Sequence, residues 1–127
     1  MNANPMARVE DIMSTAVIAM RESDSVEALR REMKRARVHH MPIVDEAQHV
    51  VGIVSARDLG GDVSDQERAG NVMTRAVWTA RPGDDIRDID DVMREYGLRS
   101  LPVVGDGEQL VGIVTDRDLR RPAAWAA

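Results

Sequence analysis

The chain has 127 residues, of which 43% are hydrophobic and 31% charged, as expected of a folded globular protein and not of a disordered one. Its net charge of −5 disfavours binding to nucleic acid or to an anionic membrane surface, because both depend on clustered Lys and Arg. It has no cysteine, which excludes a disulfide framework and a thiolate metal site. No apolar run approaches the length of a membrane span, so we expect a cytoplasmic protein with no membrane contact.

An internal repeat is the main feature of the sequence. Residues 9–59 align with residues 69–119 at a constant offset of 60 and without a gap, so that Gly52 meets Gly112. The closest match ends each copy, with VGIVSARDL in the first and VGIVTDRDL in the second. Two repeats are too few for a solenoid, and the expected arrangement is two small units that pack on each other.

The repeat divides the chain into five segments. We expect a flexible N-terminus at 1–7, a first repeat at 8–59, a polar linker at 60–68, a second repeat at 69–121 and a C-terminal tail at 122–127. The linker contains two adjacent glycines, which suits a connection between units.

Each repeat is expected to begin with a short apolar strand, at residues 17–20 and again at 77–79. Asp24 and Asp84 follow as expected helix N-caps, because a carboxylate there accepts the unpaired backbone N–H groups of the first turn.

A helix comes next in each repeat, with apolar residues at a spacing that predicts one buried stripe. The stripe residues are Val26, Leu29, Met33 and Ala36 in the first copy and Ile86, Ile89, Met93 and Tyr96 in the second. Gly97 fits the left-handed residue that commonly ends a helix. Its counterpart Arg37 must adopt that conformation at some cost or end the helix differently.

Two β-branched runs then predict a hairpin in each copy, followed by a short helix from Ser55 or Thr115. The expected strand pairs are 41–44 with 50–55 and 101–104 with 110–115. The fold class is therefore α+β, a tandem repeat of βαββα units.

The segments DIMSTAV, HHMPIV and GIVSARD, with their partners NVMTRAV, RSLPVV and GIVTDRD, resemble the CBS domain, and two such domains in tandem resemble a stand-alone Bateman module. The resemblance covers residues 8–121. It implies pseudo-twofold symmetry, two clefts between the repeats and a homodimer formed through the helices.

The resemblance also implies a function, which is a non-catalytic regulatory module for energy sensing that binds AMP, ADP or ATP in those clefts. No cofactor is required, and an unidentified protein target would read the bound state. Two alternatives remain open. One is a ligand-free dimerisation or interaction module, and the other is a CBS pair that binds S-adenosylmethionine or NAD.

By the same resemblance, Asp58 and Asp118 take the ribose diol, and a carboxylate is a suitable acceptor for two hydroxyl protons. Ser55 and Thr115, three residues earlier, meet the phosphate. The alternative is that all four residues only cap the short helices that they begin, a common role for these residue types.

Residues before the proline-containing strand supply positive charge to the phosphates in this family. They match His39 and His40 in the first copy and Arg99 and Ser100 in the second, so only the second copy offers a permanent charge. The two histidines do not indicate a metal site, because neighbouring residues of a strand point to opposite faces.

The resemblance places the adenine against the first apolar stretch of each copy. The matching residues are Ile18 and Ala19 in the first repeat and Trp78 and Thr79 in the second.

Overall fold

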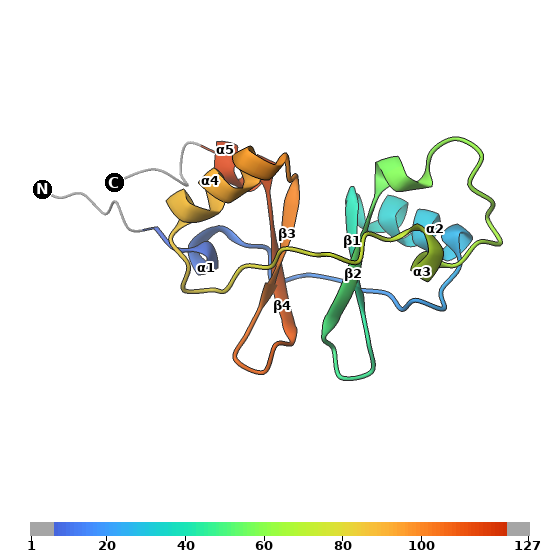
Figure 1. Ribbon diagram of the computed structural model, residues 1–127, viewed down its shortest axis with the longest axis horizontal. Coiled ribbons are helices and arrows are strands. Elements are labelled where there is room, and N and C mark those ends of the chain that lie inside the picture. Colours follow the sequence, from blue (N-terminus) through green and yellow to red (C-terminus); the bar gives the residue numbers. More distant parts are fainter. Residues whose placement is uncertain (1–6, 122–127) are drawn as a thin grey trace, which may run out of the picture. The chain divides into compact units, whose positions relative to one another are not determined.

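The computed structural model describes residues 7–121 (Figure 1). The expected flexible N-terminus, apart from Ala7, and the expected tail at 122–127 lie outside the described residues. Over the part of the chain that is described, no helix has the length and the apolar character needed to cross a bilayer.

Both repeats contain a short helix, a long helix, a hairpin and a final short helix in this order, and the α+β class is confirmed. The first repeat has α1 (Val9–Ile12), α2 (Val26–Ala36), β1 (His40–Val44), β2 (Val50–Ser55) and the 3₁₀ helix η1 (Ala56–Leu59). The second has α3 (Ala69–Val72), α4 (Ile86–Tyr96), β3 (Ser100–Val104), β4 (Leu110–Thr115) and α5 (Asp116–Arg120). β1 pairs antiparallel with β2, and β3 with β4, which confirms the two predicted hairpins.

The strands expected at the start of each repeat are not formed, and this prediction was wrong. The first stretch contributes one parallel bridge, from Met20 to Ile43 in β1, and Ala80, the residue after the second stretch, forms the equivalent bridge with Val103 in β3. Proline explains the limit: the backbone N–H of Met20 donates to the carbonyl of Pro42 at 3.1 Å, but Pro42 has no N–H with which to extend the ladder.

The helix N-caps lie one residue later than expected, at Ser25 and Asp85 instead of Asp24 and Asp84. Ser25 Oγ accepts the N–H of Ala28 at 3.1 Å, and the Asp85 carboxylate accepts the N–H two residues further on at 2.8 Å. Asp24 and Asp84 each accept the N–H three residues before them, at 2.7 and 2.9 Å. They therefore close the turn that leads into the cap.

The buried stripe of each long helix is confirmed over the first eight residues of the helix. Its buried members are Val26, Leu29 and Met33 in α2 and Ile86, Ile89 and Met93 in α4. Tyr96 was expected to continue the stripe, but its side chain is 53% exposed and Ala36 is only half-buried. Both helices end in the left-handed conformation, at Arg37 with φ 57° and at Gly97 with φ 65°.

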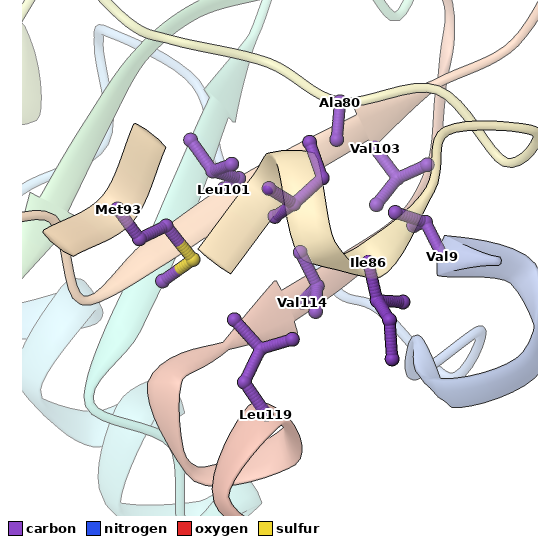
Figure 2. Close-up of a cluster of buried hydrophobic side chains, with 9 residues drawn as sticks. Val9, Ala80, Ile86, Met93, Leu101, Val103, Val114 and Leu119 are labelled. Atoms are coloured by element: carbon purple, nitrogen blue, oxygen red, sulfur yellow. The ribbon is translucent and has the colours of Figure 1, made fainter. Parts of the chain in front are cut away.

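The spatial units cross the sequence repeats, because α1 packs with the second repeat. Residues 7–17 form one compact unit with residues 78–121. The N–H of Val9 donates to the carbonyl of Asp84 at 2.9 Å, and the Val9 side chain is fully buried beside Ile86 in that unit's core (Figure 2).

The exchange is reciprocal, because α3 packs with the first repeat. Ile18–Val77 form the other compact unit. The N–H of Ala69 donates to the carbonyl of Asp24 at 2.8 Å, and Thr74 pairs with Ile53 of β2 through two backbone hydrogen bonds. Each sheet is thus flanked by the short helix that begins the other sequence repeat.

Glycine at one position of each second hairpin strand makes this exchange sterically feasible. A Cβ on Gly52 would lie 2.4 Å from the sulfur of Met73, and a Cβ on Gly112 would lie 2.9 Å from the carbonyl oxygen of Ser14. Real side chains do not approach so closely. The glycine in each GIV segment therefore lets the residues after α3 and α1 lie across β2 and β4.

Candidate functional site

The corner at the end of β2 brings Ser55 and Asp58 together. Ser55 is the last residue of the strand and the N-cap of η1, and its Oγ accepts the N–H of Asp58 at 3.2 Å. The Asp58 Oδ2 accepts the N–H of Ser55 in return, at 2.8 Å. The two residues form a capping box, in which each satisfies a donor that the helix start leaves unpaired.

The corner at the end of β4 repeats this arrangement with Thr115 and Asp118. Thr115 Oγ1 accepts the N–H of Asp118 at 3.3 Å, and Asp118 Oδ2 accepts the N–H of Thr115 at 2.9 Å. Asp118 also forms an ion pair with Arg121, whose Nη2 lies 3.7 Å from the second carboxylate oxygen. The equivalent of Arg121 in the first repeat is Gly61, so the two corners differ in charge.

Strand pairing places the predicted phosphate residues next to these corners. His40 lies opposite Ser55 in the β1–β2 register, and Ser100 lies opposite Thr115 in the β3–β4 register. The N–H of Ala56 donates to the carbonyl of His39 at 2.8 Å, which holds the start of β1 against the start of η1. Within each unit the hydroxyl, the carboxylate and the residues before the proline strand are therefore neighbours along the backbone.

Arg99 carries the permanent charge among the predicted phosphate residues of the second repeat, but an acidic neighbour compensates it in part. Its Nη1 lies 3.9 Å from a carboxylate oxygen of Asp116, which also pairs with Arg120 at 3.3 Å. Ala56 occupies the position of Asp116 in the first repeat. The permanent charge expected in the second repeat therefore lies beside a carboxylate that the sequence prediction did not consider.

The residues predicted to meet adenine differ in exposure between the repeats. Ile18 and Ala19 are half-buried, and Ile18 packs on the core of its unit. Trp78 and Thr79 are exposed, and the Trp78 ring stacks on Tyr96 with 4.7 Å between the ring centroids and 26° between the ring planes. This contact accounts for the exposed Tyr96, because the ring covers Trp78 instead of the core.

One cavity in the described part of the chain was not predicted. It lies in the Ile18–Val77 unit, has a volume of about 430 Å³ and is lined by side chains from the end of α2 and from η1. The lining residues are Arg30, Met33, Lys34, Arg37, Val38, His39, Ala56 and Leu59. No sequence pattern signalled it, because it forms where α2 meets η1. His39 lines this cavity, and His40, the first residue of β1, is not among the lining residues.

Acidic and histidine side chains do not gather into a metal centre in the described residues, 7–121, since no group of three or more His, Asp or Glu has that geometry. The pKa of Asp85 is lowered by the side-chain hydrogen bond from Arg87 and then by the Arg87 backbone N–H. Both effects belong to the cap of α4 and not to the corners.

The curated proteins that the chain resembles include proteins much longer than the chain. It is 30% identical over 119 residues to L-aspartate semialdehyde sulfurtransferase of Methanocaldococcus jannaschii, an alignment that covers 93% of this chain. The chain spans only 23% of the length of that relative, so the similarity concerns one module within it.

Solved structures match most of the chain. The CBS domain pair of protein MJ0100, in complex with 5′-methylthioadenosine and S-adenosyl-L-methionine, is 30% identical with a TM-score of 0.85 and covers 91% of this chain and 94% of that one. The cytosolic domain of the Mg²⁺ channel MgtE in complex with ATP is 30% identical with a TM-score of 0.81, over 89% of this chain and 47% of that one. CBSX2 in complex with AMP is 25% identical with a TM-score of 0.82, over 91% and 95%.

A family model decides the assignment. The CBS-domain model matches twice, at residues 9–59 and 69–123, in agreement with the 60-residue repeat and with the two matching corners. This chain belongs to the CBS-domain family and carries two tandem copies of the domain.

Proposed function

We propose that this chain is a non-catalytic regulatory module that binds an adenine nucleotide, AMP, ADP or ATP, at the corners formed by Ser55 with Asp58 and by Thr115 with Asp118. The duplicated corner carries this proposal, because it offers a carboxylate and a hydroxyl group at the same strand end in both repeats. The ligands in the similar solved structures share an adenosine group, which supports the choice of ligand.

Each predicted residue has a chemical role in this proposal. The Asp58 and Asp118 carboxylates accept hydrogen bonds from the ribose hydroxyls, which a carboxylate can do in a bidentate manner. The phosphate is bound by the hydroxyl of Ser55 or Thr115. His39 and His40 assist in the first repeat, and Arg99 and Ser100 in the second.

Adenine contacts complete the proposed site. Ile18 and Ala19 offer half-buried apolar surface in the first repeat, while Trp78 and Thr79 offer an exposed ring and a hydroxyl in the second. The ring of Trp78 provides a stacking surface that Ile18 cannot. We therefore propose that the two repeats hold the base differently.

The regulatory part of the proposal concerns partners and location. The chain acts without a cofactor of its own, as a homodimer in the cytoplasm, and a protein target responds to its nucleotide occupancy. The absence of cysteine suits a reducing compartment.

The experiment is calorimetric titration of the full chain with AMP, ADP, ATP, S-adenosylmethionine, NAD and a GTP control, followed by 2′-deoxy-ATP. A charge-assisted hydrogen bond contributes enough that loss of the 2′-hydroxyl weakens binding by roughly 10-fold. In the double variant Asp58→Asn with Asp118→Asn, ATP and 2′-deoxy-ATP are expected to bind equally weakly. Asparagine retains an acceptor for the capping hydrogen bond, so the fold is preserved.

The matched control is Asp24→Asn, which neutralises another half-buried carboxylate that accepts a backbone N–H in the same unit. It is expected to leave the preference for ATP over 2′-deoxy-ATP unchanged. Equal binding of the two nucleotides by the unmodified chain contradicts the proposed ribose contact, and absence of binding by every adenosine ligand contradicts the nucleotide function.

Two other candidates have observations in their favour. The capping boxes give Ser55, Asp58, Thr115 and Asp118 a structural role, which favours a ligand-free dimerisation or interaction module. S-adenosylmethionine as ligand is favoured by its presence in the MJ0100 complex. The first candidate predicts no heat with any ligand in the titration, and the second predicts tighter binding of S-adenosylmethionine than of ATP.

A further inference from the structure

The cavity beside the end of α2 has an apolar floor and a basic rim. Met33, Val38 and Leu59 belong to the apolar part of the lining, and all three are buried or half-buried. The volume of about 430 Å³ falls within the range of about 300–1,000 Å³ found for small-molecule sites.

The charge of the rim is specific to this unit. Its permanent cations are Arg30, Lys34 and Arg37. The equivalent positions of the second repeat hold Asp90, Arg94 and Gly97, and Asp116 stands where the first repeat has Ala56. The three cations of the first repeat therefore give these positions a net charge of +3. In the second repeat Arg94 and Arg99 balance Asp90 and Asp116, so the net charge of the equivalent positions is zero.

Arg30 fixes one wall of the cavity. Its Nη2 donates to the carbonyls of Leu59 at 2.7 Å and Val63 at 3.0 Å, and its Nε lies 3.4 Å from a carboxylate oxygen of Asp65. These contacts hold η1 and the following linker against α2. Arg30 thus shapes the site, while the other rim cations are available for a ligand.

Within the described part of the chain, no acidic side chain neutralises Lys34 or Arg37. Neither side chain forms an ion pair with any residue among 7–121. A favourable interaction with the carbonyl end of α2 explains positive charge near the helix terminus. It does not explain why both side chains line one cavity.

The backbone of Arg37 is a second and independent observation. Arg37 adopts φ 57° and ψ 43°, the left-handed conformation that costs an ordinary residue energy and costs glycine almost nothing. The second repeat has Gly97 at this point, with φ 65°. The first repeat thus keeps a long cation at a strained position, and strain of this kind is often retained for a functional side chain.

We propose that this cavity binds a polyphosphate group, with Lys34, Arg37 and His39 as its ligands. Arg pairs with phosphate oxygens in a bidentate manner, and Lys supplies a compact point charge. Several converging cations match a group that carries several negative charges better than they match a carboxylate. This site is separate from the proposed nucleotide-binding corners, and His39 is the one residue that both proposals use.

The test is calorimetric titration of the full chain with inorganic tripolyphosphate, against sodium sulfate at matched ionic strength. Tripolyphosphate is expected to bind and sulfate to bind far more weakly. Arg37→Gly installs the residue of the second repeat, so it folds, and loss of its charged hydrogen bonds is expected to weaken binding by roughly 10-fold or more. Lys34→Ala is expected to weaken it by a smaller factor.

Arg31→Ala is the matched control, because Arg31 is an exposed cation on the same helix outside the cavity lining. It is expected to change the affinity by less than about 2-fold. An equal loss of tripolyphosphate affinity in Arg31→Ala and Arg37→Gly overturns the proposal, since it indicates nonspecific attraction to the basic helix. Absence of tripolyphosphate binding at millimolar concentration overturns it as well.

Nucleotide titrations separate the two sources of the phosphate chain and keep this proposal distinct from the corner sites. If Arg37→Gly weakens ATP but not AMP, the cavity holds the phosphate chain of a nucleotide. If it weakens only tripolyphosphate, the cavity binds a free polyphosphate. Loss of AMP binding in the Asp58 and Asp118 variants, with tripolyphosphate binding kept, supports both sites separately.

Discussion

The two units have the same backbone plan but opposite helix charges. α2 carries four cationic and two anionic residues, whereas α4 carries two cationic and four anionic ones. The apolar residues of the two helices nevertheless coincide, with Leu29 matching Ile89 and Met33 matching Met93. The buried stripe therefore determines the fold, and the exposed positions are free to give each repeat its own electrostatic surface.

The largest effect is expected from matched core truncations. Leu29→Ala removes a fully buried side chain from the Ile18–Val77 unit and is expected to lower the free energy of unfolding by about 3 kcal/mol. Ile89→Ala is expected to do the same in the other unit, where Ile89 is 6% exposed. Amide hydrogen exchange is expected to locate each loss in its own unit. Uniform loss across both would show that the units unfold only together.

Val9→Ala sharpens the comparison because Val9 lies in the first sequence repeat but in the core of the second repeat's unit. Loss of two buried methyl groups is expected to cost about 2 kcal/mol, measured by chemical denaturation. Protection from exchange is expected to fall in residues 78–121 and to persist in residues 18–68. Loss within 18–68 instead would contradict the exchange of α1.

A swap at the helix ends tests the conformational difference between Arg37 and Gly97. Gly97→Arg places a side chain in the left-handed region and is expected to lower stability by about 1 kcal/mol. Arg37→Gly is expected to be neutral or slightly stabilising. Thermal unfolding of each variant measures its change in stability. A large loss of stability in Arg37→Gly would show that the arginine side chain supports the fold itself.

The helix caps give the smallest effect and one that depends on pH. Ser25→Ala is expected to cost about 1 kcal/mol at any pH, because a hydroxyl cap does not titrate there. Asp85 has its pKa lowered by Arg87, so its folded pKa lies below the unfolded value of about 3.9. Its contribution is therefore complete above that value and is lost as the pH falls through the folded pKa.

Denaturation at neutral and at strongly acid pH measures the difference. Asp85→Ala is expected to lower the free energy of unfolding at neutral pH and to leave it unchanged at strongly acid pH. A constant effect across the range would indicate that Asp85 caps α4 through its shape and not its charge.

The sequence predicted the elements whose signals are long or repeated. Both hairpins and both long helices were expected, because alternation and helical periodicity extend over many residues there. The four-residue helices α1 and α3 were not expected, since one turn contains too little periodicity. The caps at Ser25 and Asp85 were misplaced by one residue, because two adjacent residues in each repeat have a side chain that can cap a helix.

The site was predicted in part for a different reason. The short-range pairs, Ser55 with Asp58 and Thr115 with Asp118, follow from spacing along one turn, and the structure brings each pair together. The cavity at Arg37 depends on how α2 meets η1, which no local pattern encodes. The exchange of α1 and α3 was equally invisible, because either repeat offers the same apolar surface to either helix.

That exchange has a consequence for how the protein is made. Ile18–Val77 are continuous along the chain, so their unit can close as soon as the ribosome has delivered them. The other unit needs Val9, which precedes those residues in the chain, and Leu119, which follows them. The segment around Val9 is thus synthesised before the Ile18–Val77 unit but finds its place after it, and a chain cut at the linker would leave each half without a helix that its core requires.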